Sequence, residues 1–141
     1  MKLLYKEADS SLKEFIYNEC MKLVYKYENL NNIPLKVIEN FEREKVENDI
    51  NKYTAVYDGE EFIGCFKLTK ENEYYELDDL YIVEDKRNKG YGTKILEECI
   101  THLPLVLYVF KDNKIAYDLY LRYGFEVIED LDTRVKMKKT H

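Results

Sequence analysis

One stretch, residues 75–100 (YELDDLYIVEDKRNKGYGTKILEECI), constrains the fold more than any other part of the sequence. Tyr75–Val83 is rich in residues that favour β-strands, and strand alternation puts four of its side chains on one face: Glu76, Asp78, Leu80 and Ile82. Lys86–Lys94 follows, with two glycines and four basic residues. Apolar residues then recur at helical spacing, at Tyr91, Ile95, Leu96, Cys99, Ile100 and Leu103. A strand that leads through a basic glycine turn into a helix is typical of a phosphate site, because the first N–H groups of a helix have no partner.

The turn differs from two common phosphate-binding loops. The dinucleotide fingerprint G-x-G-x-x-G requires a third glycine where this chain has Ile95. A Walker loop requires Gly-Lys-Ser/Thr, whereas Lys89 precedes Gly90. The residues present, Arg87–Gly92, follow the pattern Arg-x-x-Gly-x-Gly instead. Taken alone, so short a glycine pattern also fits a solvated basic loop.

The remaining sequence predicts alternating helices and strands. Strands are expected at residues 2–6, 53–57, 61–68, 104–110, 125–128 and 134–138, and helices at residues 12–29, 35–48 and 113–123. Ser11 and Glu14 form a capping box, Asp58-Gly59 indicates a hairpin, and Gly124 suits the end of the last helix. The strand–helix–strand unit ending at Phe110 predicts two parallel strands with a right-handed crossover. We therefore expect an α/β fold with a mixed sheet, in a single domain over residues 1–141.

Composition and charge exclude several classes of protein. The net charge of -6 argues against a nucleic-acid partner, which usually requires a basic face. The sequence contains no apolar run of about 18 residues, and its start becomes charged too early for a signal peptide. We therefore expect no membrane partner and a cytoplasmic location. Three widely spaced cysteines (Cys20, Cys65 and Cys99) and two histidines predict inert thiols and no metal site.

Two motifs carry a resemblance to a known family. Arg87–Gly92 resembles the acetyl-coenzyme A (acetyl-CoA) diphosphate loop of the GNAT superfamily of N-acetyltransferases. Asn113–Phe125 is similar to the GNAT stretch Asn-x-x-Ala-x-x-Leu-Tyr-x-x-x-Gly-Phe, with matches at Asn113, Ala116, Leu119, Tyr120, Gly124 and Phe125. The element order extends the resemblance to nearly the full chain. It implies a GNAT-like fold: a mostly antiparallel sheet with a central parallel βαβ unit and helices on both faces. Glu84 departs from the family pattern, in which a proline often precedes the loop.

The resemblance implies a set of contacts with acetyl-CoA as co-substrate. Backbone groups of the central strand would bind the pantetheine arm where that strand splays from its neighbour at a bulge. The loop and the start of its helix would hold the diphosphate. Asn113 would meet the pantetheine, although it equally suits capping of its own helix. The residues expected in contact with the co-substrate are Leu80, Tyr81, Ile82, Val83, Arg87, Asn88, Lys89, Gly90, Tyr91, Gly92, Thr93, Asn113 and Tyr120.

The implied reaction moves an acetyl group from acetyl-CoA to a primary amine by direct attack, and it has two proton-transfer tasks. Glu76 occupies the position at which several GNAT enzymes keep a glutamate base, and Asp78 is the next choice. Tyr120 falls on the general-acid tyrosine of the family, and a phenol can donate to the leaving thiolate. Each residue also has a structural alternative: an exposed strand carboxylate for Glu76 and a packing aromatic for Tyr120.

The charge pattern indicates the acceptor only broadly. Residues 71–85 contain seven acids and no base, whereas Lys86–Lys94 contains four bases and no acid. This polarity suits an anionic donor and a cationic acceptor, either a small-molecule or a peptide amine. Two rival functions stay open: a non-catalytic acyl-CoA-binding module and a different nucleotide-binding α/β protein. The acceptor, the acyl group and the oligomeric state are also open, although GNAT members are often homodimers.

Overall fold

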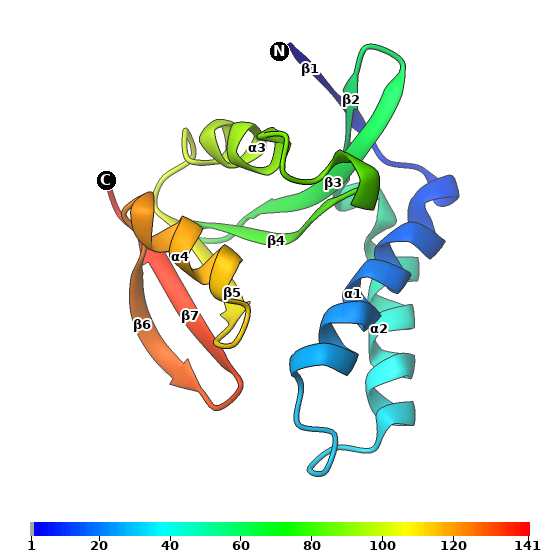
Figure 1. The fold of residues 1–141 in the computed structure, drawn as a ribbon, viewed down its shortest axis with the longest axis vertical. Helices are drawn as coiled ribbons and strands as arrows, with labels where there is room; N and C mark the ends of the chain where they lie inside the picture. The colour runs from blue at the N-terminus through cyan, green and yellow to red at the C-terminus, as the bar shows by residue number, and fades with distance from the viewer. Residues whose placement is uncertain (1) are drawn as a thin grey trace.

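Seven strands form one sheet in the order β1-β2-β3-β4-β5-β7-β6 (Figure 1). The structure is a computed structural model that describes residues 2–141. The strands are β1 (Leu3–Glu7), β2 (Tyr53–Asp58), β3 (Glu61–Lys70), β4 (Tyr75–Ile82), β5 (Leu105–Phe110), β6 (Glu126–Leu131) and β7 (Arg134–Lys139). The helices are α1 (Lys13–Tyr27), α2 (Leu35–Asp49), α3 (Tyr91–Cys99) and α4 (Lys114–Arg122).

The sheet is mixed, as the sequence predicts. Strands β4 and β5 pair in parallel, and every other neighbouring pair is antiparallel. Helix α3 makes the crossover between the two parallel strands, which forms the expected central βαβ unit. This arrangement confirms the predicted GNAT-like fold class.

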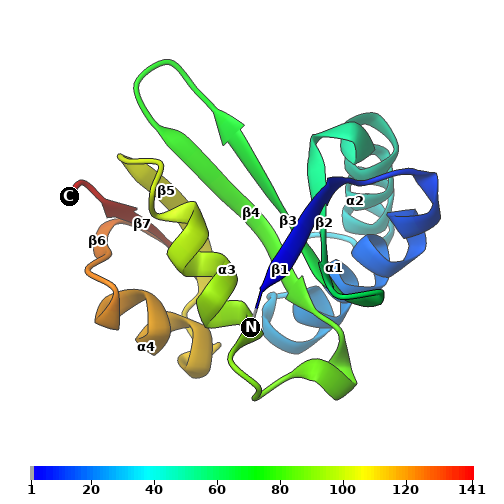
Figure 2. The same cartoon turned by 90° about the horizontal axis from the view of Figure 1, so that it is seen from above.

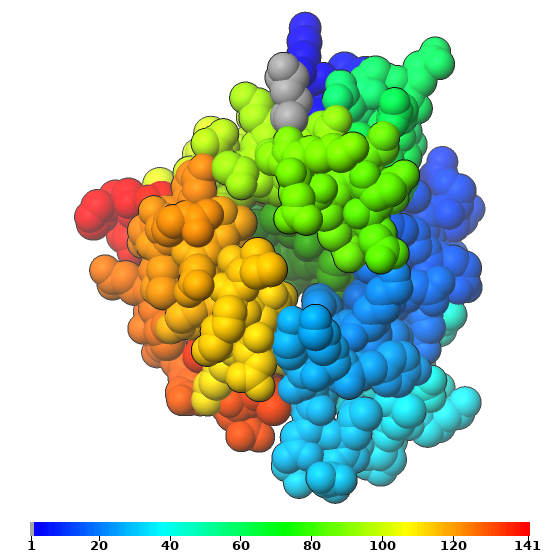
Figure 3. Space-filling view, viewed as in Figure 1, coloured from blue at the N-terminus to red at the C-terminus, as the bar shows by residue number. Residues whose placement is uncertain are grey.

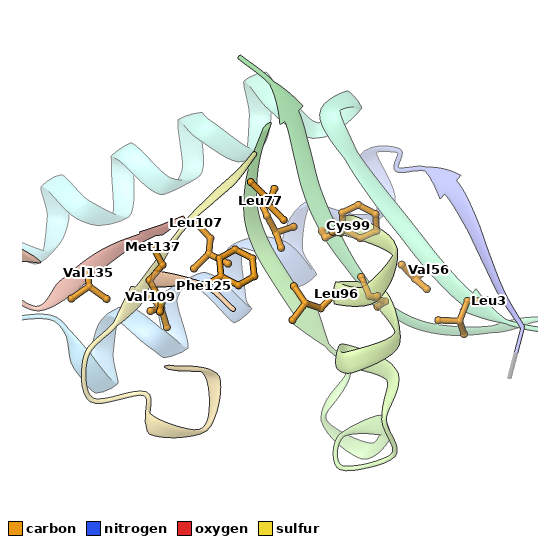
Figure 4. Packing of buried hydrophobic residues seen from close by; sticks show 13 residues of the cluster. Leu3, Val56, Leu77, Leu96, Cys99, Leu107, Val109, Phe125, Val135 and Met137 are labelled. Carbon is orange, nitrogen blue, oxygen red and sulfur yellow. The ribbon is translucent and has the colours of Figure 1, made fainter. Parts of the chain in front are cut away.

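Helices cover both faces of the sheet (Figure 2). Helices α3 and α4 lie on one face, where the apolar stripe of α3 is buried through Ile95, Leu96 and Cys99. These side chains share a core with Leu77 of β4 and with Phe125, which precedes β6 (Figure 4). Helices α1 and α2 lie on the opposite face and bury a smaller set of residues against the sheet: Ile16, Val46, Tyr53 and Cys65. The two faces of β4 therefore have different neighbours: α3 and α4 on one face, and α1 and α2 on the other.

Three local predictions need correction. Ser11 does not cap α1; instead Asp9 accepts a hydrogen bond from the Ser11 N–H, because a short 3₁₀ turn over Ser10–Leu12 precedes the helix. The hairpin turn is formed by residues 59 and 60, since β2 extends to Asp58. Helix α3 ends at Cys99, where the Thr101 hydroxyl binds the Glu98 carbonyl, and not at Leu103. Gly124 does follow the end of α4 with a φ of 89°, as expected.

Candidate active site

The central parallel strands separate after a short ladder. Tyr75–Leu77 of β4 pair with Leu105–Leu107 of β5. The pairing stops there, although β4 continues to Ile82 and β5 to Phe110. Backbone N–H and C=O groups of β4 that face β5 beyond Leu77 therefore lack a ladder partner within residues 2–141. Such unpaired groups can bind a ligand that carries amide bonds.

A β-bulge lies where the two strands separate. Lys67 pairs with Asp78 but Cys65 pairs with Tyr81, so β4 has one more residue than β3 over this segment. Asp79 has a φ of 54°, the left-handed conformation of one type of bulge. An extra residue reverses the alternation of side chains along a strand. The prediction that residues 76, 78, 80 and 82 share one face is therefore wrong: Leu80 and Ile82 pack against the α3–α4 core, together with Leu77.

Contacts from two other elements hold the Asp79 carboxylate. Its oxygens accept hydrogen bonds from the hydroxyl groups of Tyr53, at 2.5 Å, and Tyr81, at 2.9 Å. The Lys45 ammonium on α2 lies 3.1 Å from the same carboxylate. Burial opposes the charge, but the Lys45 ammonium and the two hydroxyls together keep the pKa of Asp79 below its ordinary value. Asp79 is thus an ionised anchor for the bulge.

A cavity of about 460 Å³ opens beside the bulge. Its lining comes from α1 and α2 on one side and from β5 and α4 on the other, with Leu77–Tyr81 of β4 between them. Figure 3 shows a recess between α1, in blue, and α4, in orange, with green at its floor. The cavity therefore lies where the backbone groups of β4 are unpaired.

The structure separates the two carboxylates proposed as a base. Asp78 lines the cavity, whereas Glu76 is not among the lining residues. Burial raises the pKa of Asp78 to about 8, and a hydrogen bond with Glu76 and the charges of Glu76 and Asp79 add to this effect. A carboxyl group with this pKa can accept a proton near neutral pH. Asp78, the second choice from the sequence, is thus the carboxylate that reaches the cavity.

Tyr120 and Asn113 line the same cavity from the α4 side. The Tyr120 ring packs edge-on against Phe125 with their centroids 5.7 Å apart. Burial and the neighbouring Cys99 raise the pKa of Tyr120 to about 12, so its hydroxyl keeps its proton at neutral pH. Asn113 precedes α4, but its side chain forms no capping hydrogen bond with this helix. The cavity lining therefore includes both residues, and capping does not explain the asparagine.

The glycine turn presents the open end of α3. Gly90 is the residue before the helix and has a φ of 87°, and no side chain caps this end among the described residues. A Cβ atom on Gly90 would meet nothing within 4 Å, and one on Gly92 would meet only Ile82, at 3.8 Å. The first-turn N–H groups thus lie beside the end of β4 and face open space. This arrangement fits an anion such as a diphosphate.

Arg87 forms two contacts that its position in the motif does not predict. Its guanidinium lies 3.2 Å from the buried carboxylate of Glu19 on α1 and donates to the Ile82 carbonyl at 3.0 Å. Two further contacts join the loop region to the β2–β3 hairpin: an ion pair of Lys86 with Glu61, and a 2.7 Å hydrogen bond from Tyr91 to Asp58. Arg87, although exposed, therefore attaches the loop to α1, and Lys89 in the same loop is also exposed to solvent.

Comparison with known families agrees with this geometry. The acetyltransferase (GNAT) family profile matches residues 14–125, which include the loop, the bulge, Asp78 and Tyr120. The chain belongs to the GNAT acetyltransferase family. It is accordingly an acyltransferase. No curated protein sequence matches this GNAT enzyme.

Solved structures share the fold of this GNAT enzyme at low sequence identity. The PaiA N-acetyltransferase from Thermoplasma acidophilum, in complex with coenzyme A, is 21% identical with a TM-score of 0.73, and the match covers 100% of both chains. A GNAT family acetyltransferase from Streptococcus agalactiae is 12% identical with a TM-score of 0.75, over 99% of this chain and 95% of that one. A GNAT family acetyltransferase from Elizabethkingia anophelis with acetyl-CoA bound is 17% identical with a TM-score of 0.61, over 70% of this chain and 82% of that one.

The sequence did not predict three residues at the site of this GNAT enzyme: Asp79, Lys45 and Glu19. Asp79 has a local signal, because aspartate is depleted in strands and tolerates the left-handed conformation that a bulge requires. Lys45 and Glu19 have none, since each contacts a residue far along the chain. Of the seven acids in residues 71–85, only Asp78 and Asp79 line the cavity. The other five do not line the cavity.

Two negative findings concern the described part of the chain. Within residues 2–141, no three side chains of the types His, Cys, Asp and Glu are placed to hold a metal ion. None of the helices there combines the length and the apolar character needed to cross a bilayer.

Proposed function

We propose that this GNAT enzyme transfers an acetyl group from acetyl-CoA to a primary amine by direct attack. One observation carries the proposal: Asp78, on the strand at the floor, and Tyr120, on the α4 side, line a single cavity beside the segment of β4 that no longer pairs with β5. The first is suited to accept a proton near neutral pH and the second to donate a hydrogen bond.

Different groups of the protein would bind the different parts of acetyl-CoA. The N–H groups at the start of α3 would bind the diphosphate, with Lys89 adding positive charge. The backbone of Leu80–Val83, where the chain no longer pairs with β5, would bind the amide groups of the pantetheine arm. Asn113, which forms no cap on α4, would add a side-chain contact to that arm. Together these groups would place the thioester near Asp78 and Tyr120.

The two side chains would then serve the two protons. Asp78 accepts a proton from the amine as its nitrogen forms the new C–N bond, and backbone N–H groups at the bulge stabilise negative charge on the carbonyl oxygen. When the C–S bond breaks, the Tyr120 hydroxyl donates to the leaving thiolate. Glu76 acts through Asp78, because its charge and hydrogen bond hold the Asp78 pKa high. The products are an N-acetyl amine and free coenzyme A.

Thiol release tests this function directly. Purified protein is incubated with acetyl-CoA and a panel of monoamines, diamines, aminoglycosides and peptides, and the product is identified by the added mass of one acetyl group. Release of thiol that depends on an amine, with a matching acetylated product, is the expected outcome. Tight binding of acetyl-CoA in calorimetry without release for any amine would instead support a non-catalytic acyl-CoA-binding module.

A further inference from the structure

The mouth of the cavity is apolar and exposed. Ile33, Val37 and Phe41 line the cavity and are 43%, 56% and 63% exposed, respectively. Asp78, by contrast, is half-buried on the strand at the floor. On α2, residues 37 and 41 are one turn apart, so their side chains form a continuous apolar surface that leads toward the acidic floor. Large exposed apolar side chains that line a cavity are typical of a binding surface.

The other carboxylates that line the cavity already have partners. Glu42 and Asp79 share the Lys45 ammonium, at 3.0 Å and 3.1 Å. Glu28 accepts hydrogen bonds from the Thr133 hydroxyl, at 2.7 Å, and from a backbone N–H. Within residues 2–141, Asp78 is the lining carboxylate whose hydrogen-bond partner is another carboxyl group, that of Glu76, which raises the Asp78 pKa. Asp78 is therefore the lining carboxylate left open to an amine, whereas Glu28 is engaged by neutral donors and Glu42 and Asp79 by Lys45.

A second cation at the mouth of the cavity would lie beside apolar side chains and the positive charge of Arg134. The mouth residues Ile33, Val37 and Phe41 cannot pair with an ammonium, and desolvation of an unpaired charge is costly. The exposed Arg134, whose guanidinium lies 5.9 Å from the Phe110 ring, adds a positive charge to the lining. The charge pattern thus favours a ligand with one amine and an uncharged remainder.

We infer that the acceptor is a primary monoamine that carries an apolar chain or ring, with its nitrogen at Asp78 and its apolar part against Val37 and Phe41. This inference rests on the proposed function and narrows it to a substrate class. Phe41 and Val37 are then specificity-determining residues. Each methylene buried at the mouth should improve kcat/KM roughly fourfold, as expected for the removal of apolar surface from water.

A matched pair of amines tests the inference. n-Hexylamine and 1,6-diaminohexane have the same chain length, but the diamine places a second ammonium at the apolar mouth. We expect kcat/KM for hexylamine to exceed that for the diamine by roughly tenfold or more, and to exceed that for ethylamine as well. Equal values, or a preference for the diamine, would overturn the inference while leaving amine acetylation intact. Absence of turnover with every amine would overturn both proposals.

Variants of Phe41 test whether the preference for an apolar amine depends on the surface of α2. Phe41→Ala should lower kcat/KM for hexylamine by roughly tenfold and leave that for ethylamine nearly unchanged, because only the longer amine reaches the mouth. Phe41→Glu should shift the preference toward the diamine. Ile128→Ala is the matched control, since Ile128 is 50% exposed on β6 and does not line the cavity. An equal response of both amines to Phe41→Ala would overturn the inference.

Sedimentation velocity separates this surface from an interface between copies of the chain. We expect Phe41→Ala and the unmodified protein to sediment alike. A dimer that dissociates in the variant would show that a second copy covers Val37 and Phe41, and this result would overturn the inference.

Discussion

The ammonium group of Lys45 lies 3.1 Å from the carboxylate of Asp79, and this contact joins helix α2 to the bulge of the central strand. Asp79 has a φ of 54°, a conformation that few residues other than glycine adopt. The ion pair and the two tyrosine hydroxyls hold the residue in that conformation. The bulge separates the faces of Asp78 and Leu80, so the geometry of the active site depends on the contact between Lys45 and Asp79.

Removal of the anchor should destabilise the fold. We expect Asp79→Ala to lower the free energy of unfolding by about 3–5 kcal/mol, because the hydroxyls of Tyr53 and Tyr81 lose their acceptor and Lys45 keeps only Glu42 as a partner. Urea denaturation at neutral pH measures the change. Lys45→Met should cost less in the Asp79→Ala background than in the unmodified protein, since its contact with Asp79 is already lost. Additive losses in the double variant would show that the two residues do not interact.

Asp78 should control the pH dependence of the reaction. The group must be ionised to accept a proton, and its pKa is raised to about 8. We therefore expect kcat/KM to fall about tenfold per pH unit below pH 8. Asp78→Asn should reduce kcat/KM by about 100-fold or more and remove this limb of the profile. A variant that keeps the wild-type profile would exclude Asp78 as the base.

Asp78→Asn should also stabilise the protein at neutral pH. The pKa is higher in the folded than in the unfolded state, so Asp78 supports the fold below the unfolded value and loses that contribution as pH rises toward 8. The neutral amide removes this loss. Thermal unfolding should show a higher Tm for the variant at pH 8 than for the unmodified protein, with the difference disappearing near pH 4.

Glu76→Gln distinguishes an indirect role from a direct one. Because Glu76 raises the Asp78 pKa, its replacement should move the acidic limb of the profile to lower pH and preserve the maximal rate. If Glu76 were itself the base, the maximal rate would fall instead. The pH–rate profiles of the two variants, measured in parallel, decide between the carboxylates.

Tyr120→Phe should reduce turnover without weakening donor binding. Tyr120 lines the cavity, its hydroxyl has a pKa of about 12, and loss of that hydroxyl would remove the proposed hydrogen bond to the leaving thiolate. A positioned general acid typically contributes about 100-fold or more to the rate. Pre-steady-state thiol release measures turnover, and calorimetry with acetyl-CoA measures affinity. Unchanged turnover would remove Tyr120 from the mechanism.

Two glycines provide a matched test of the diphosphate loop. Gly90 and Gly59 both have positive φ, at 87° and 64°, and a Cβ atom on either would meet nothing within 4 Å. Alanine at each position should therefore destabilise the fold by a similar amount, about 1–2 kcal/mol. Only Gly90→Ala should weaken acetyl-CoA binding, roughly tenfold, because it reorients the first N–H groups of α3. Equal affinities of the two variants would place the diphosphate elsewhere.

Much of the fold could be predicted because its signals are local. Three kinds of signal involve only a few neighbouring residues: the apolar stripe of α3, the glycine at position 124, and the β-branched residues of the strands. Such signals predicted nearly every helix and strand to within a few positions of its observed bounds. The capping box failed for the opposite reason. Ser11 and Glu14 match the pattern, but a 3₁₀ turn capped by Asp9 precedes the helix.

The sequence alone determined the order of the elements, the glycine turn before α3 and the position of Tyr120 on α4. Only the tertiary structure decided that a bulge reverses the face of β4 at Asp79, that Arg87 binds Glu19, and that Asp78 reaches the cavity while Glu76 does not. Alternation along a strand is a property of neighbouring residues. A bulge instead depends on the register with β3 and on the contact with Lys45, which is distant in the chain and adjacent only after folding.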